Sequence, residues 1–476
     1  MKSPPYDVAI VGAGYTGIAL TVDLLSRLAD GSRLLLLGAP GRIGLGLAYG
    51  TDCPDHLLNV RAARMSALAG DSEHFVRWLQ DRQRTSGSAA LAESYVPRAT
   101  YGRYLQETLY RAIANAAGRV RVDIVEGTAV DIEKLEPGYT VRAASGQTFI
   151  ASVLALCLGH GRSRFPFAEE DSDSAAVNRL IGEPFSDYRM SAIPRDASVL
   201  MVGSGLTMID QVLTLDRAAH QGPIIAVSRH GRLPQAHLET RAQPLAIDLP
   251  GPNPTLSRLF RAIVAAARHE TAANGDWRAA IDGLRPVSQA IWQSLTSSDR
   301  RRFNRHVESI WSIHRHRMAP PVAARIAALR QSGRLTVRAG RIVAVRGTAR
   351  GVVAALQPRG KRTVDLLSFD WLINCSGVGG RFEDDPLVAR LMAKGLARSN
   401  EGGVVDLASD CALVGRNGRA VAGLFALGPM THGRFREITA VPEIREQCAT
   451  VAATISQAIS NYRRSFVALR RGSNDR

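Results

Sequence analysis

The sequence predicts an α/β protein with two Rossmann-like dinucleotide-binding domains, the second inserted in the first, and with a helical subdomain. The first observation behind this prediction is an apolar run, a Gly-x-Gly turn and an apolar helical pattern between Val8 and Leu25. The second is a similar pattern about 190 residues later, between Ala197 and Leu213. The third is a pair of apolar strands, Ser152–Gly161 and Asp370–Gly380, which both end in a glycine-containing exit.

The first glycine turn, Gly12-Ala-Gly14-Tyr-Thr-Gly17, directly follows the apolar run Val8–Val11. In such a strand–turn–helix unit, Gly12 allows the tight turn, Gly14 permits the close approach of a pyrophosphate, and Gly17 lets the helix pack closely on the strand. The free N–H groups at the start of the helix then face the phosphates. The alternative is an ordinary turn between a strand and a helix, but the position near the N-terminus favours dinucleotide binding.

The next apolar strand, Arg33–Leu37, departs from the dinucleotide-binding pattern. An Asp or Glu roughly 20 residues after the glycine turn usually holds the ribose hydroxyls. Here the strand ends in Gly38, and no acidic residue follows before Asp52. The ribose must therefore be held by other groups, or the site is weakened.

The glycine-rich stretch Gly44–Leu68 has two interpretations. It is either a loop that leads into a helix or a segment that lies along an extended cofactor. On the second interpretation, the candidate cofactor-binding residues are Asn59, Arg64, Met65 and Ser66.

The second glycine turn contains Gly203, Gly205 and Thr207, with Met208 in place of a third glycine. Its partner strand, Pro223–Val227, is followed by Ser228-Arg229 and carries no acid at its end. An Arg at this place accommodates the 2′-phosphate of NADP, so the pattern favours NADPH over NADH. The alternative is a surface Arg in an arginine-rich protein.

Between the two strand exits, the chain is expected to contain a linker, Phe165–Arg195, and a mostly helical segment, 254–331. The helical segment includes a dense basic run between Arg300 and Arg317. This run is either a solvated helix face or a lining that binds an anion. No His, Cys or acidic residues have a metal-ligand spacing, so no metal site is expected.

The composition limits the classes of partner. The net charge of +17 suggests nucleic acid, but only four of the 60 basic residues are lysine, and the arginines are spread over the whole length. A site for an acidic substrate or a cofactor phosphate is the better interpretation, and nucleic acid is not expected. Five scattered cysteines without a C-x-x-C pair favour a reducing cytoplasm. The first residues lack an apolar signal-peptide region, and no apolar run approaches the ~20 residues of a membrane span.

Together these segments resemble the two-dinucleotide-domain flavoproteins, such as the flavin-containing and N-hydroxylating monooxygenases, and more closely the bacterial FAD/NAD(P)-binding proteins. The likeness covers nearly the whole chain and lies in VAIVGAGYTG, GLAYGT with HLLNVRAARMS, YVPR, VGSGLTMID, SRHGRLP, the run Trp311–Arg317, NCSG, and ALGP with EITAVPEIR. It implies FAD on the first glycine turn and a nicotinamide cofactor on the second. It also implies cofactor contacts at Gly428, Pro429, Thr439 and Ala440, although Gly428-Pro429 lacks the acid that many such proteins carry in their last cofactor turn. His432, Arg434 and Glu437 are further candidates to line the flavin.

The resemblance also implies a domain plan. The FAD-binding domain comprises residues 1–165 and 366–476. The NAD(P)H-binding domain comprises residues 190–365 and contains the helical insert near 250–330.

The implied function is an FAD-dependent oxidoreductase that takes hydride from NADPH and inserts oxygen into a small-molecule substrate, which could be anionic. The cofactor carries the chemistry, and no catalytic acid or base can be assigned. One alternative is a flavin reductase or dehydrogenase that does not use oxygen. Another is a non-catalytic, cofactor-binding regulatory protein.

Overall fold

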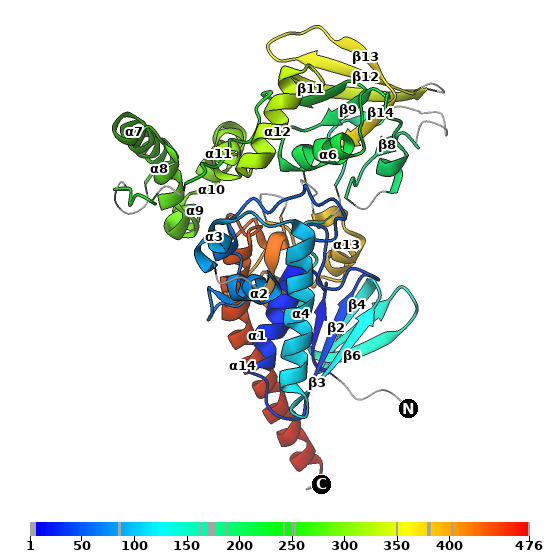
Figure 1. The fold of residues 1–476 in the computed structure, drawn as a ribbon. Helices are drawn as coiled ribbons and strands as arrows, with labels where there is room; N and C mark the ends of the chain where they lie inside the picture. The colour runs from blue at the N-terminus through cyan, green and yellow to red at the C-terminus, as the bar shows by residue number, and fades with distance from the viewer. Residues whose placement is uncertain are drawn as a thin grey trace. The chain divides into compact units, whose positions relative to one another are not determined.

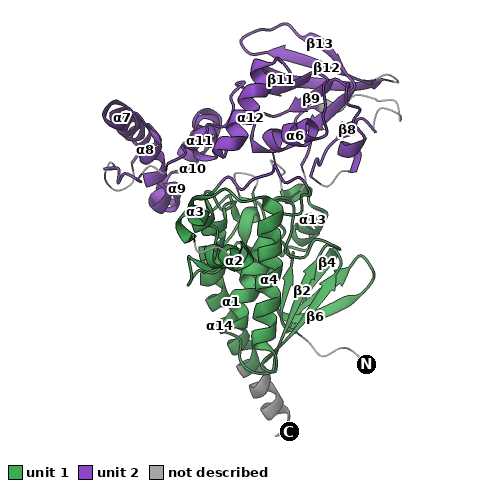
Figure 2. Ribbon diagram, viewed as in Figure 1, with its two compact units in different colours: residues 1–52, 60–161, 380–476 green, residues 53–59, 162–379 purple. Residues whose placement is uncertain are grey.

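The computed structural model describes residues 6–83, 87–161, 163–169, 178–185, 188–240, 243–249, 251, 254–348, 351–377, 382–400 and 404–474. The chain forms two compact units, coloured separately in Figure 2. Unit 1 comprises Met1–Asp52, Val60–Gly161 and Gly380–Arg476, and unit 2 comprises Cys53–Asn59 and Arg162–Gly379. Each unit contains its own sheet.

The sheet of unit 1 is built around a parallel core. Its strand order is β15 (Ala412–Val414), β16 (Ala420–Ala426), β6 (Thr148–Leu156), β1 (Tyr6–Val11), β2 (Ser32–Gly38) and β3 (Val120–Glu126). The hairpin of β4 (Ala129–Leu135) and β5 (Gly138–Ala143) pairs with β6. β1 runs parallel to both β2 and β6. The central strands are almost continuously apolar and buried, as parallel strands covered on both faces must be.

Three helices of unit 1 pack together. α1 (Tyr15–Leu25) packs against α4 (Arg98–Ala116) and α14 (Val441–Asn474), and the three lie side by side in Figure 1. α13 (Pro386–Ala393) packs on β4. The shorter helices are η1 (Ala62–Arg64), α2 (His74–Gln83), α3 (Ser88–Glu93), η5 (Phe382–Asp384) and η6 (Gly428–Thr431). α14 continues as helix to Asn474.

The sheet of unit 2 mixes parallel and antiparallel pairs. Its order is β13 (Asp365–Phe369), β12 (Gly351–Pro358), β11 (Leu335–Thr348), β10 (Ile224–Ser228), β9 (Val199–Val202), β14 (Trp371–Asn374) and β8 (Leu180–Ile181), with β7 (Ala168–Glu169) beside β11. The long strand β11 runs parallel to β10 up to Ala339 and then pairs antiparallel with β12. β7 and β8 lie in the stretch that was expected to be a linker, so part of it joins the sheet.

Helices flank and extend this second sheet. α6 (Leu206–Arg217) and α12 (Pro320–Gln331) contribute to the core beside β9 and β10. A helical part follows with α7 (Leu256–Asn274), α8 (Arg278–Gly283), η3 (Arg285–Val287), α9 (Ser288–Ser294), α10 (Ser297–Arg302), the π-helix η4 (Phe303–Val307) and α11 (Glu308–Arg315). Its small apolar cluster contains Leu259, Trp292 and Leu295. Two α/β sheets with a helical part confirm the predicted fold class.

The basic run Arg300–Arg317 is not one solvated face. Arg301, Arg302 and Arg305 are exposed, as that interpretation requires. Arg315 and Arg317 are buried, and Arg317 forms an ion pair with Asp282. The solvated-face interpretation is therefore wrong for the end of the run. A charged side chain is almost never buried without a partner, and Arg317 has one in Asp282.

Candidate functional site

The first glycine turn joins the carboxyl end of β1 to the start of α1. Gly12 has φ +108°, and a Cβ there would lie 2.2 Å from the carbonyl oxygen of Cys157 at the end of β6. A Cβ on Gly17 would lie 1.9 Å from the carbonyl oxygen of Gly12. The two glycines therefore let the turn meet β6 and let α1 press against the turn, which are the roles that the motif assigns to them.

Gly14 differs from these two because a Cβ there would make only an ordinary van der Waals contact. It is the N-cap of α1, and no side chain caps the helix or places a negative charge in its first turn. The nearest atom to a Cβ on Gly14 would be the Cα of Gly46, at 3.5 Å. The first N–H groups of a helix have no partner within the helix. The turn is therefore a cradle where an anion could approach the helix start closely.

The end of β2 explains the missing acid. A Cβ on Gly38 would lie 2.3 Å from the Cβ of Ala13 and 2.8 Å from Cδ1 of Ile43. An Asp or Glu therefore has no room at position 38. The neighbouring strand carries a carboxylate at the same level, because Glu126 is the register partner of Gly38. Its Oε1 accepts a hydrogen bond of 3.1 Å from the backbone N–H of Gly41, in the loop after β2.

The last cofactor turn lies against the start of α1. Gly428 has φ +73°, and a Cβ there would lie 2.4 Å from Oγ1 of Thr16. Its N–H donates to Oε1 of Gln447 at 2.8 Å, and both Gly428 and Pro429 are buried. Residues 412 positions apart in the sequence are therefore in contact at the first glycine turn.

Thr439 and Ala440 precede α14, whose first residue also reaches the start of α1. The hydroxyl of Tyr15 donates a hydrogen bond of 3.2 Å to the carbonyl oxygen of Val441. Thr439 is exposed and Ala440 is partly buried. The structure thus brings together three predicted segments of unit 1, namely the first glycine turn, the turn at Gly428 and the start of α14.

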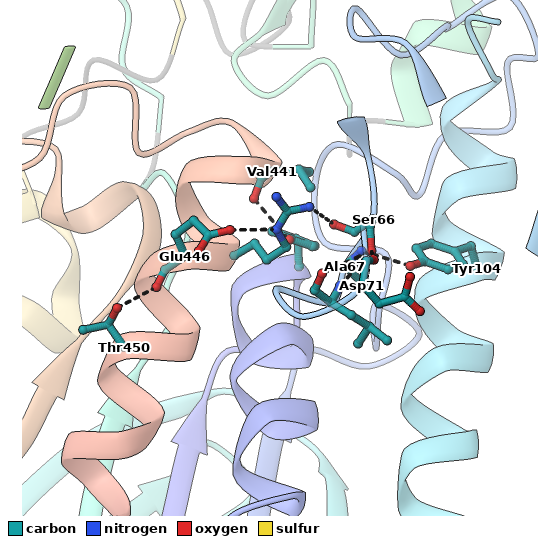
Figure 3. A network of polar contacts seen from close by, with 10 residues as sticks. Ser66, Ala67, Asp71, Tyr104, Val441, Glu446 and Thr450 are labelled. Atoms are coloured by element: carbon teal, nitrogen blue, oxygen red, sulfur yellow. Dashed lines mark hydrogen bonds and ion pairs between the residues drawn. The ribbon is translucent and has the colours of Figure 1, made fainter. Parts of the chain in front are cut away.

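Met65 and Ser66 are buried in a loop that a polar network holds against α4 and α14 (Figure 3). Oγ of Ser66 donates to the carbonyl oxygen of Asp71 at 2.5 Å, and the N–H of Ala67 donates to the hydroxyl of Tyr104 at 2.9 Å. Arg445 of α14 donates from Nη1 to the carbonyl oxygen of Ser66 at 3.1 Å. The Ser66 side chain therefore fixes the loop, and the contacts in which it takes part are made within unit 1.

The remaining sequence candidates make contacts of other kinds. Asn59 belongs to the short segment of unit 2, where its carbonyl oxygen lies 3.0 Å from Nε2 of His237. Arg64 is the last residue of η1 and is partly buried. Arg434 donates to the carbonyl oxygen of Leu407 at 3.2 Å, whereas Glu437 is buried with φ +62° and His432 is exposed.

The second glycine turn repeats the construction of the first. Gly203 has φ +112°, and a Cβ there would lie 2.0 Å from the carbonyl oxygen of Cys375 at the end of β14. Gly205 is exposed, caps α6 without a side-chain hydrogen bond, and has no atom within 4 Å of the place a Cβ would take. Thr207 lies in the first turn of α6 and is partly buried. This turn is again a cradle at the start of a helix.

The end of β10 lies next to this cradle. Oγ of Ser204 lies 2.7 Å from Oγ of Ser228, and Ser228 also accepts a hydrogen bond of 3.1 Å from the N–H of Gly231. Ser228 therefore holds the turn in place. Arg229 is exposed, and the part of the chain that the structure describes offers its side chain no hydrogen bond or ion pair. Its guanidinium is available to an anionic ligand.

Arg359 is a residue that the sequence analysis missed. It follows β12, and its N–H donates a hydrogen bond of 3.0 Å to the carbonyl oxygen of Ala339. Ala339 is the register partner of Ser228, so Arg359 lies at the level of the end of β10, on the other side of β11. No local pattern marks this residue, since its place depends on the pairing of three strands.

The described residues contain no group of three His, Cys, Asp or Glu side chains arranged to hold a metal ion. Within the same residues, no helix is long and apolar enough to cross a membrane.

Comparison with known proteins adds family and fold. Residues 9–161 match the model of a family described as FAD-NAD(P)-binding. Over 157 residues, or 32% of this chain, the sequence is 29% identical to an L-aspartate N-monooxygenase (nitrosuccinate-forming) of Streptomyces cremeus. The match spans 23% of the length of that curated relative.

Solved structures match over nearly the whole chain. The ornithine hydroxylase of Pseudomonas aeruginosa in its reduced form has a TM-score of 0.62 at 15% identity, covering 96% of this chain and 100% of its own. The L-lysine 6-monooxygenase of Pseudomonas syringae has a TM-score of 0.63 at 18% identity, covering 95% and 99%. The ornithine N-hydroxylase of Kutzneria sp. 744 has a TM-score of 0.60 at 16% identity, covering 95% and 99%. The resemblance inferred from the sequence is confirmed: the chain has the two-Rossmann-domain fold of the flavin-dependent N-hydroxylating monooxygenases, and its residues 9–161 carry the FAD-NAD(P)-binding family match.

Proposed function

We propose that this protein is an FAD- and NADPH-dependent monooxygenase that hydroxylates the nitrogen of a small amine or amino acid. The observation that carries the proposal is the duplicated cradle, in which Gly14 and Gly205 each leave the start of a helix open. Two such sites suit an enzyme that binds two dinucleotides. Structural neighbours include an ornithine hydroxylase and an L-lysine 6-monooxygenase, and one neighbour was solved with reduced FAD, NADP⁺ and L-ornithine.

In this proposal, unit 1 holds FAD. The FAD-binding domain is assigned to residues 1–165 and 366–476. Unit 1 supports a discontinuous domain, because β1 and β16 share one sheet, but residues 366–379 belong to unit 2 and carry β14 of its sheet. The open face of Gly14 suits the pyrophosphate, and the N–H groups at the start of α1 would neutralise part of its charge. Arg64, Met65, Gly428, Pro429, Thr439 and Ala440 are proposed to line the same cofactor. Bound FAD supplies the redox and oxygen chemistry, and the protein positions it.

Glu126 is proposed to replace the missing ribose acid. The space at position 38 is filled by Ala13 and Ile43, whereas Glu126 is exposed and projects from the adjacent strand end. A carboxylate accepts hydrogen bonds from two vicinal hydroxyls, which is the role that the usual acid fulfils.

Unit 2 is proposed to hold NADPH, with the nicotinamide domain assigned to residues 190–365. Gly203, Gly205 and Thr207 would take the pyrophosphate, and Ser228 shapes the turn that presents Arg229. The exposed guanidinium of Arg229, at the end of β10, suits a 2′-phosphate. It therefore favours NADPH over NADH as the cofactor.

The test is a purification with FAD followed by three measurements on the same sample. The first is the absorption spectrum with and without NADPH, and the second is oxygen consumption. The third is colorimetric detection of hydroxylamine with L-ornithine, L-lysine, cadaverine and L-aspartate as separate substrates. The proposal expects bound flavin that NADPH bleaches, oxygen uptake, and a hydroxylamine product from at least one amine.

The rival functions give different patterns in these measurements. A flavin reductase or dehydrogenase would be bleached by NADPH and re-oxidised by an artificial acceptor without oxygen uptake. A cofactor-binding regulatory protein would bind a nucleotide without turnover. Either pattern would replace the monooxygenase proposal.

A further inference from the structure

The turn after β10 and the turn after β12 both place arginines near Ala339, in the middle of β11. The first turn contains Arg229, His230, Gly231 and Arg232, and the second contains Arg359. A Cβ on Gly231 would lie 3.0 Å from the backbone nitrogen of Ala339. The N–H of Arg359 donates to the carbonyl oxygen of that same residue at 3.0 Å. Both turns are therefore fixed on Ala339 of β11.

In the described part of the chain, the arginines of these two turns form no ion pair with an acidic group. Arg232 donates from Nη1 to Oγ of Ser309 at 3.3 Å, which is a neutral partner. Arg229 and Arg359 are both exposed, and among the described residues their guanidinium groups have no hydrogen-bonding or ion-pairing partner. By contrast, Arg338 on β11 pairs with Asp365 at 3.5 Å. Arg338 is thus neutralised by an acidic residue of the protein, whereas Arg229 and Arg359 are not.

The pKa of His230 is affected by the charges of these arginines. Burial lowers the pKa of His230, and the charges of Arg359, Arg232 and Arg229 lower it further, with no carboxylate contributing. Its ring nitrogen Nδ1 is buried without a hydrogen-bond partner in the described structure. The pKa of His230 therefore responds to three guanidinium groups, which come from the turn after β10 and the turn after β12.

We infer that Arg359 and Arg229 together form a two-arginine site for the 2′-phosphate of NADPH. Arg229 comes from the turn after β10, and Arg359 is the second specificity-determining residue, from the turn after β12. This inference rests on the proposed nicotinamide site of unit 2. A phosphate monoester carries close to two negative charges at neutral pH. Two guanidinium groups match that charge, and each provides directional donors to phosphate oxygens. A single Arg229 would leave half of the charge without a partner.

The experiment measures binding rather than turnover. Adenosine 2′,5′-bisphosphate and AMP serve as probes in isothermal titration of the full-length protein, since they differ only in the 2′-phosphate. The variants are Arg229→Ala, Arg359→Ala and Arg359→Lys. The control is Arg330→Ala. It removes an exposed arginine from α12, which precedes the first residue of β11 and lies outside the two turns.

Each arginine should contribute at least tenfold to the affinity for the bisphosphate and almost nothing to that for AMP. Arg359→Lys should recover part of the loss, because a lysine keeps the charge without the planar fork. Arg330→Ala should bind both probes as the parent does. Circular dichroism spectra of all variants should match that of the parent.

Two results would overturn the inference in distinguishable ways. If Arg229→Ala loses bisphosphate affinity while Arg359→Ala does not, the two-arginine site is refuted and the proposed function stands. If the parent binds the bisphosphate and AMP equally, the NADPH assignment of unit 2 fails together with this inference.

Discussion

Gly38 and Ala13 are packed so closely that a Cβ on Gly38 would lie 2.3 Å from the Cβ of Ala13. The glycine at the end of β2 is therefore required by the loop of the first glycine turn, and its lack of an acid is a packing consequence. A second neighbour, Ile43, closes the remaining space at 2.8 Å. Tight contact between β2 and the turn thus leaves no room for an acid at the end of β2.

Restoring the acid should therefore harm the protein. Gly38→Glu is expected to destabilise unit 1 by roughly 1–3 kcal/mol, because the new side chain overpacks a filled site, and to reduce FAD content. Thermal unfolding and the ratio of flavin to protein absorbance would measure both effects. A Gly38→Glu variant that is stable and binds FAD more tightly would show that the packing argument is wrong.

Glu126 should matter for the adenosine half of FAD alone. Glu126→Gln is expected to weaken FAD binding about tenfold or more, because a hydrogen bond to a charged group contributes roughly 1.5–3 kcal/mol. Binding of FMN, which lacks the adenosine, should not change. Fluorescence quenching titrations of the apoprotein with the two flavins give both affinities. Equal losses for FAD and FMN would assign Glu126 to the structure of the loop at Gly41.

Gly14 gives the sharpest test of the first cradle. The Cβ of Gly14→Val meets no atom closer than 3.5 Å, so the variant should fold, yet its side chain would occupy the approach of a pyrophosphate. We expect colourless protein with an unfolding temperature near that of the apoprotein. Gly70→Val is the control, because a Cβ at Gly70 meets nothing within 4 Å. Normal flavin content in Gly14→Val would remove the first glycine turn from the cofactor site.

The sequence could predict what is local and could not predict what the sheet brings together. Gly12, Gly14, Gly203 and Gly205 are recognisable because a strand, a turn and a helix follow one another within about 15 residues. The contact of Tyr15 with Val441 joins residues 426 positions apart and depends on the packing of α14 on α1. Arg359 reaches the β10 turn because β11 pairs with β10 and then with β12, and no motif records that change of partner.

Asp131 should give unit 1 a measurable pH dependence. Its carboxylate accepts from Nζ of Lys394 at 2.6 Å and from Nη2 of Arg142 at 3.1 Å, and the bond from Lys394 is the largest cause of its lowered pKa. A depressed pKa means that the unfolded state binds the proton more tightly. The stabilisation is therefore complete above the unfolded pKa of ~3.9 and is lost as the pH falls through the lower folded pKa.

Asp131→Asn should accordingly reduce the free energy of unfolding by roughly 1–3 kcal/mol at pH 7. The difference from the parent should close as the pH falls below the lowered folded-state pKa of Asp131. Urea unfolding at several pH values measures it. Glu133→Gln is the control, because Glu133 is largely exposed and its ion pair with Lys394 is longer, at 3.5 Å. A gap between Asp131→Asn and the parent that does not change with pH would contradict the ion-pair origin.

Substitution by alanine should destabilise the protein strongly at Arg317 and hardly at all at Arg305, although both residues belong to one basic run. Arg317 is buried, pairs with Asp282 and lies with its Cζ 5.8 Å from the ring centroid of Trp277. Arg317→Ala leaves Asp282 without this partner and is expected to cost roughly 3–5 kcal/mol of unit 2 stability. Arg305 is exposed on η4, so Arg305→Ala should stay within about 0.5 kcal/mol of the parent. Urea unfolding followed by tryptophan fluorescence measures both variants. An Arg305→Ala variant with normal stability but a flatter salt dependence of NADPH oxidation would mean that the exposed arginines steer an anionic ligand, because screening weakens such steering.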